Sequence, residues 1–168
     1  PVGGETWSVG TNQLIQWNTI GPIQFVGLEY SANNGSSWIP ITASTPNAGK
    51  YNWNIPDNLT IQALIKIYDT SDLTVIHTSP MVFKIQGSFT VVSPNGGEAW
   101  LVGASNNVTW TSAGSYSNVK LEYSTDSGDT WPGGNLIVAS TAADPPPSDD
   151  IGTYAWTIPT GFTGDHPN

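Results

Sequence analysis

The sequence predicts an all-β protein made of two tandem immunoglobulin-like β-sandwich modules, the second either truncated or completed by a strand from elsewhere. Three observations lead to this fold class. Only 10% of the 168 residues are charged, whereas helices carry charged residues on their exposed faces. Apolar and polar residues alternate in short runs, which is the period of a strand. The chain also repeats itself, with about seven short strands expected per repeat, as in such sandwiches.

The internal repeat defines both modules. Residues 1–10, with the motif Pro-x-Gly-Gly-Glu-x-Trp-x-x-Gly, match residues 94–103 at an offset of 93. An insertion in the second copy then shifts the match of residues 49–56 to residues 152–159. All eight tryptophans occupy four recurring positions. We predict core positions for Trp17, Trp53, Trp110 and Trp156, and leave Trp7, Trp38, Trp100 and Trp131 unassigned.

Alternating runs predict the strands of the first module in order, with turn signals between them. Ile15 and Trp17 share one face of the first run. Val26, Leu28 and Tyr30 share one face of the second run. Clusters of Asn, Asp, Ser and Gly separate the runs. The expected strands are residues 14–17, 25–30, 51–55, 63–68, 74–77 and 81–85.

The two ends of the chain predict incomplete sandwiches. A hinge at residues 86–88 gives domains at 1–88 and 89–168. Residues 89–92 form a first strand for the second module, whereas the first module begins at the turn that follows this strand. The second module lacks the last strands of the first and so exposes an open edge. Either the chain is a window from a longer repeat array, or a neighbouring subunit supplies the strands by strand addition.

Composition and charge exclude several function classes. The net charge is −9 and the chain has no Arg, which removes the electrostatic basis for binding nucleic acid or an anionic membrane. Without Cys there are no disulfides or thiolate metal sites. His77 and His166 have no recurring Ser or Asp partner, so a nucleophile–base arrangement has no support. We therefore expect that the protein is not an enzyme and that it has no cofactor and no metal site.

The recurring glutamates favour structural roles over the paired carboxylates of a glycosidase. Glu5 and Glu98 lie in Gly-Gly-Glu turns, where they can accept hydrogen bonds from local backbone N–H groups. Glu29 and Glu122 alternate with apolar neighbours, so we expect them to face away from the core.

A second motif marks a hairpin tip in each repeat. Residues 124–131 fit the Asp-box pattern Ser-x-Asp-x-Gly-x-Thr-Trp, with a degenerate copy at residues 31–38. Sialidases use such boxes, but they need arginines that this chain lacks. Asp126 and Asp129 are two carboxylates for a Ca²⁺ ion that takes six to eight ligands. The motif therefore favours a turn-stabilising role, in which Asp accepts N–H bonds, Gly takes a positive φ and Trp packs beneath.

The recurring motifs resemble a known family. Besides the turn motif, both repeats carry Ile/Val-x-Trp, Val-x-Leu-Glu-Tyr-Ser and Tyr-x-Trp-x-Ile-Pro. These motifs resemble the Ser-Thr-rich, GPI-anchored and yeast cell-wall-synthesis N-terminal-domain family over nearly the whole chain. The resemblance implies an extracellular immunoglobulin-like sandwich, one of several in a cell-surface or secreted chain, without catalytic residues.

Two further features suggest modification and contact sites. Asn34, Asn58 and Asn107 begin Asn-x-Ser/Thr sequons and are candidate glycosylation sites. Asn107 lies out of phase with the apolar residues of its run, so it should face solvent. The second repeat also contains an inserted loop at 139–151 with three consecutive prolines, expected to project as an extended, semi-rigid segment. The candidate assembly contacts are Pro145, Pro146, Pro147 and Phe162.

Two functional hypotheses follow. The first is an extracellular structural protein: a repeat building block of a cell-surface fibre, filament or surface layer, which self-associates into a polymer. The alternative is a non-catalytic carbohydrate-binding or spacer module of a secreted polysaccharide hydrolase, with glycans stacking on exposed Tyr116, Trp131 or Phe162. Both place the chain outside the cell or on its surface, with no nucleic-acid partner and no membrane insertion.

Overall fold

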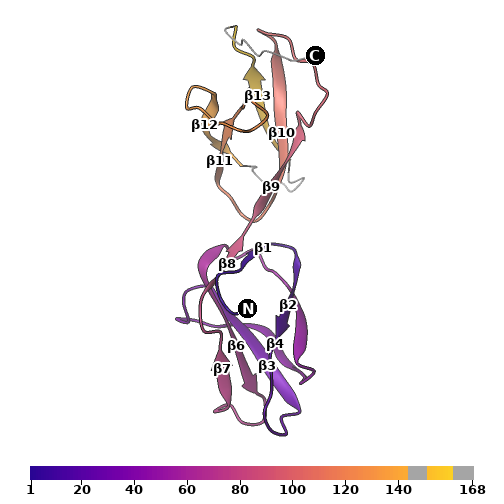
Figure 1. Ribbon diagram of the computed structural model, residues 1–168, viewed down its shortest axis with the longest axis vertical. Coiled ribbons are helices and arrows are strands. Elements are labelled where there is room, and N and C mark those ends of the chain that lie inside the picture. The colour runs from indigo at the N-terminus through magenta and orange to yellow at the C-terminus, as the bar shows by residue number, and fades with distance from the viewer. Residues whose placement is uncertain (144–150, 161–168) are drawn as a thin grey trace. The chain divides into compact units, whose positions relative to one another are not determined.

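A computed structural model describes residues 1–143 and 151–160 of the chain. The described part is all-β, with thirteen strands and no helix (Figure 1). The chain divides into two compact units. Unit 1 comprises Pro1–Ser88 with Ala113–Ser115, and unit 2 comprises the rest from Phe89 onward. The predicted fold class is confirmed by the all-β architecture, and each unit is described separately below.

Unit 1 is a sandwich of two sheets (Figure 1). The larger sheet has the strand order β1-β8-β6-β3-β4, with β7 also paired to β6, and the smaller sheet pairs β2 with β5. All pairs are antiparallel except β1 with β8. The strands are β1 (Thr6–Ser8), β2 (Asn12–Gln16), β3 (Phe25–Ser31), β4 (Ile39–Pro46), β5 (Lys50–Asn54), β6 (Thr60–Asp69), β7 (Ile76–Thr78) and β8 (Phe83–Gln86).

The core of unit 1 lies between these sheets and follows the predicted alternation. Val26, Leu28 and Tyr30 of β3 are at most 5% exposed, while Glu29 between them is excluded from the core cluster. Trp53 and Ile15 come from the smaller sheet. The remaining core members are Trp7, Ile55, Ala63, Ile65, Phe83 and Ile85.

The outer face of β3 is closely packed at one glycine. Gly27 pairs with Tyr68 of β6, and a Cβ placed on Gly27 would lie 2.2 Å from Cζ of Tyr68. The tyrosine ring therefore occupies the space that any larger residue at position 27 would need. Beside it, Glu29 forms an ion pair with Lys66 of β6, with 2.5 Å between Oε2 and Nζ.

Unit 2 contains one three-stranded sheet, in the order β13-β10-β9, and one hairpin of β11 with β12. Val108 and Trp110 of β10 are buried, and Asn107, which directly precedes Val108, is exposed, as predicted. By the repeat, β10, β11, β12 and β13 correspond to β2, β3, β4 and β5. The strands are β9 (Ser88–Ser93), β10 (Ser105–Ala113), β11 (Asn118–Glu122), β12 (Leu136–Ala142) and β13 (Ile151–Thr157).

Three expectations need correction. Strand β12 extends to Ala142, so the residues at 139–142 are strand, not the start of the inserted loop. Trp17 and Trp156 are only partly buried, although both were predicted as core. Trp7, left unassigned, is 8% exposed because the pairing of β1 with β8 brings it against Phe83, with ring centroids 4.6 Å apart.

Candidate functional site

The Asp-box motifs form the same hydrogen-bonded turn in both units. In unit 2, Oδ1 of Asp126 accepts bonds from the Ser124 hydroxyl (2.5 Å) and the Thr130 N–H (2.9 Å), and Oδ2 accepts one from the Thr130 hydroxyl (2.5 Å). These three donors lower the pKa of Asp126 to about 2. Gly128 has a φ of 91°, a conformation that suits glycine. The predicted hydrogen bonds and the positive φ of the turn are confirmed, whereas Trp131, expected to pack beneath the turn, is 56% exposed.

In unit 1 the degenerate copy replaces the carboxylate with an amide. Asn33 Oδ1 accepts bonds from the Ser31 hydroxyl and the Ser37 N–H, both at 2.9 Å. Ser31 is fully buried, and its Oγ also accepts a bond from the Gly35 N–H at 2.8 Å. The two hairpins thus share one geometry with different charge, which makes the unit 1 turn an internal control for the unit 2 turn.

The Gly-Gly-Glu turns behave as predicted. Glu98 accepts bonds from the N–H groups of Asn95 and Gly96, both at 2.8 Å, and these bonds lower its pKa. Glu5 accepts the equivalent bonds from Val2 (2.6 Å) and Gly3 (2.8 Å). Desolvation opposes ionisation of Glu5, but its backbone donors leave the pKa lowered. Both glutamates are turn stabilisers.

The most distinctive site of unit 2 is an open strand edge beside an apolar groove. Among residues 1–143 and 151–160, β11 pairs only with β12, whereas its counterpart β3 pairs with both β4 and β6. Backbone groups alternate in direction along a strand. The N–H of Tyr123 and the carbonyl of Ser117 bond toward the β12 side, so the backbone groups of Lys120 and Glu122 point to the open side.

A groove of about 450 Å³ in unit 1 and one of about 410 Å³ in unit 2 adjoin unpaired edges. The unit 2 groove is lined mainly by apolar side chains: Phe89, Val91, Trp110, Val119, Leu121 and Trp131, with Lys120 and Glu122. The repeat could have identified Val119 and Leu121 as groove residues, because they match Val26 and Leu28, which are buried in unit 1, where β3 pairs with β6.

Three equivalent aromatic rings in each unit, the aromatic trio, differ in burial, and those of unit 2 are less covered. In unit 1, Trp53 contacts Trp7 and Tyr30, with centroids 6.1 and 4.9 Å away, and all three rings are buried. In unit 2, Trp156 contacts Trp100 and Tyr123 at 6.2 and 5.1 Å, yet all three rings are only partly buried. The trio keeps its geometry, but unit 2 has no described counterparts of β6 and β8 to cover it.

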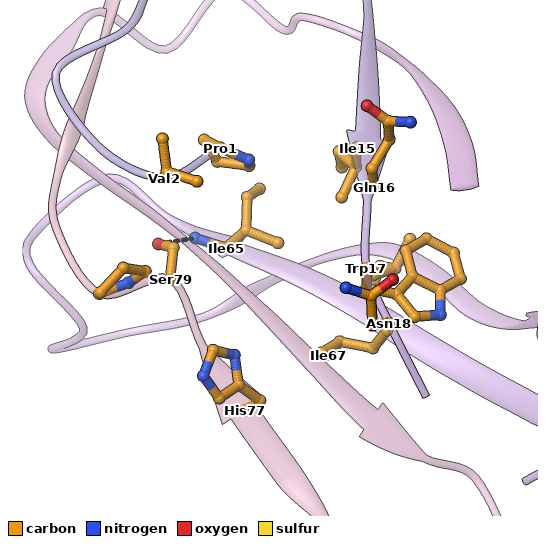
Figure 2. A pocket seen from close by; sticks show the side chains of 12 residues that line it. Pro1, Val2, Ile15, Gln16, Trp17, Asn18, Ile65, Ile67, His77 and Ser79 are labelled. Carbon is orange, nitrogen blue, oxygen red and sulfur yellow. Dashed lines mark hydrogen bonds between the residues drawn. The ribbon is translucent and has the colours of Figure 1, made fainter. Parts of the chain in front are cut away.

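The unit 1 groove lies between the two sheets (Figure 2). Ile15, Gln16 and Trp17 line one wall, and Ile65 and Ile67 of β6 come from the other sheet. Pro1, Val2, His77 and Ser79 complete the visible rim, and the Ser79 hydroxyl accepts the Ile65 N–H at 3.1 Å. His77 is exposed. The groove brings together apolar residues from β2 and β6 but no pair of groups arranged for acid–base chemistry.

The sequons differ in accessibility. Asn34 lies exposed at the hairpin tip with a φ of 55°, and Asn107 is exposed on β10. Asn58 is partly buried, and its side-chain amide donates to the Tyr30 hydroxyl at 3.3 Å. The geometry therefore favours Asn34 and Asn107 as acceptors.

The proposed contact residues are unevenly placed. Pro145, Pro146, Pro147 and Phe162 lie outside the described residues. Trp131 is 56% exposed. Tyr116 is partly buried and its ring packs 4.6 Å from that of Phe89. Of the described aromatics suggested for sugar stacking, Trp131 is therefore the more exposed.

In the described part of the chain, no group of three or more His, Asp or Glu side chains could hold a metal ion. Nor does this part contain a helix of the length and apolarity needed to cross a membrane.

The fold and its open edges define a protein built of immunoglobulin-like β-sandwich units. No family model matches the sequence, and no curated protein matches it. The chain is similar to a solved structure described as fibronectin(III)-like modules of CbhA from Clostridium thermocellum, with 13% identity and a TM-score of 0.29. That match covers 94% of this chain and 76% of the other. The fold assignment rests on the strands and registers of this chain itself.

Proposed function

We propose that the protein is an extracellular structural protein, a building block of a cell-surface fibre, filament or layer in which neighbouring units complete one another's sheets. The observation that carries this proposal is the open edge of β11 beside an apolar groove. An unpaired edge of this kind accepts a further strand through main-chain bonds, while pockets take its alternate side chains.

Unit 1 indicates what the added strand resembles. There β6 pairs antiparallel with β3, placing Ile65 opposite Tyr30 and Ile67 opposite Leu28. A strand with apolar residues at the same alternate positions would cover Leu121 and the aromatic trio of unit 2. Repeated from copy to copy, such a head-to-tail contact does not close on itself and grows into a filament. The resemblance of the motifs to a cell-surface family supports the extracellular location.

The test removes one hydrogen-bond donor from the open edge. Lys120→Pro deletes a backbone N–H on the open side of β11, and proline is tolerated on edge strands. Lys120→Ala is the matched control, because it removes the same side chain and its ion pair with Glu122 but keeps the N–H. We expect negative-stain images and sedimentation to show polymers for the parent chain and the alanine variant. Lys120→Pro should reduce the polymer fraction at least tenfold.

A parent chain that stays monomeric, unfolds cooperatively and binds no hydrophobic dye would contradict the assembly proposal.

Glycosylation is proposed at Asn34 and Asn107. Intact mass before and after enzymatic deglycosylation of protein from its native host tests this modification.

The alternative, a carbohydrate-binding or spacer module, is favoured by one observation, the exposed side chain of Trp131. Aromatic rings of this kind present apolar surface for sugar rings. Retention of the unpolymerised chain on insoluble glucan or chitin, lost in Trp131→Ala but kept in Trp38→Ala, would support this function. Trp38 is the repeat-matched control because Lys66 covers its ring, with Nζ 4.4 Å from the centroid.

A further inference from the structure

The outer edge of β2 in unit 1 is a second unpaired edge. Among the described residues, β2 pairs with β5 alone. The Trp17 N–H, just beyond β2, donates to the Gly49 carbonyl on the β5 side, at 3.1 Å. Since backbone groups alternate in direction, those of Leu14 and Gln16 face away from β5. The donors and acceptors of this edge are available to a further strand.

An apolar groove runs beside this edge. Its walls bring Ile15 and Trp17 opposite Ile65 and Ile67, and Pro1 and Val2 lie at its rim (Figure 2). Beyond Trp17 it continues into a second hollow of about 290 Å³, lined by residues that include Ile23, Val26 and Ile76. A strand added to the edge of β2 would therefore hydrogen-bond to its free backbone groups and place apolar side chains in the groove.

In unit 2 the corresponding position beside β10 is occupied by a strand. There β9 pairs with β10, the counterpart of β2, on the side away from β13. Phe89 and Val91 of β9 line the unit 2 groove together with Trp110. Trp110 is 3% exposed, whereas its counterpart Trp17 is only partly buried. The two tryptophans therefore differ in burial at one repeat position, and β9 pairs with the strand that carries the more buried one.

We propose that the unit 1 groove binds an extended strand of the β9 type, with apolar residues at alternate positions. This strand is joined to Pro1 in the same chain. In unit 2 the residues of β9 directly precede Pro94, the counterpart of Pro1. Pro1 itself lines the groove, so a strand attached to it reaches the β2 edge without a linker. This assignment goes beyond the proposed function and does not depend on polymer formation.

The test grafts the sequence of residues 88–93, Ser-Phe-Thr-Val-Val-Ser, directly before Pro1 of the full chain. The matched control graft carries Asp in place of the copies of Phe89 and Val91. We expect the amide hydrogens of Leu14 and Gln16 to exchange at least tenfold more slowly in the graft than in the control. Unchanged exchange at both amides, with the Ile15 amide still protected by β5, would overturn the proposal.

Two further arms distinguish other outcomes. If the free hexapeptide protects Leu14 and Gln16 while the graft does not, the strand comes from another chain and the same-chain assignment is wrong. If the graft does not fold, Val91→Asp in the ungrafted chain decides. Exchange at Asn107 and Thr109, the counterparts of Leu14 and Gln16, should become at least tenfold faster, and unchanged exchange there overturns the proposal.

Discussion

Replacing the same repeat tryptophan in each unit tests whether unit 2 lacks cover. Trp53 is 6% exposed and packs against two aromatic rings inside a complete sandwich. A buried Trp removes roughly 200 Å² from water, worth about 5 kcal/mol at ~25 cal/mol per Å². Truncation of large core aromatics costs about 3–5 kcal/mol. We expect Trp53→Ala to destabilise unit 1 by an amount in that range.

Trp156→Ala is the matched variant, with the smaller cost. Its ring is partly exposed, and water can enter the space that it leaves, so the cavity contribution is small. We expect a loss of about 2 kcal/mol for unit 2. Hydrogen exchange of the full chain in a urea series separates the units, because amides of β3 report on unit 1 and amides of β11 report on unit 2. Equal costs at the two positions would refute the reasoning that unit 2 is under-covered.

Two further predictions follow. Trp110→Ala should lower the free energy of unfolding of unit 2 by about 3–5 kcal/mol and so unfold it. Trp17→Ala should lower that of unit 1 by clearly less, because its ring is already partly exposed. Urea midpoints followed by hydrogen exchange check both. Since hydrogen bonds lower the pKa of Asp126 to about 2, the carboxylate stabilises its hairpin above pH 4 and this contribution is lost as pH falls from about 4 to 2. Protection from exchange in the hairpin at 124–131, taken relative to the intrinsic rate at each pH, should therefore decrease over that window. Asp126→Asn, like the natural Asn33 turn, should not respond, and equal acid responses would contradict the assignment.

The sequence predicted the strands that bury alternate residues and missed those whose pairing comes from elsewhere. The clean alternation of residues 25–30 and 51–55 located β3 and β5. Strand β4 was missed because its two prolines and polar residues form no periodic pattern, and only its ladder with β3 holds it extended. Strand β1 is three residues long and depends on a parallel pairing with distant β8, which local pattern cannot reveal.

The candidate site was predicted only in outline. The repeat predicted incomplete sandwiches, but not which strand edges are unpaired among the described residues. That information required the registers around β2 and β11. The burial of Trp17 was overestimated for the same reason: alternation places its ring on the inner face, but cover depends on a neighbour that the local sequence does not contain.

The close packing at Gly27 also bears on how two similar units avoid exchanging strands. The repeat places Lys120 where unit 1 has Gly27, and in unit 1 the Tyr68 ring fills the space that a side chain there would need. A strand carrying tyrosine in the β6 register would therefore collide with Lys120 if it were to join β11. Adjacent, alike domains are prone to exchange elements during folding. We therefore expect the glycine-to-lysine difference to disfavour such misassembly by steric exclusion.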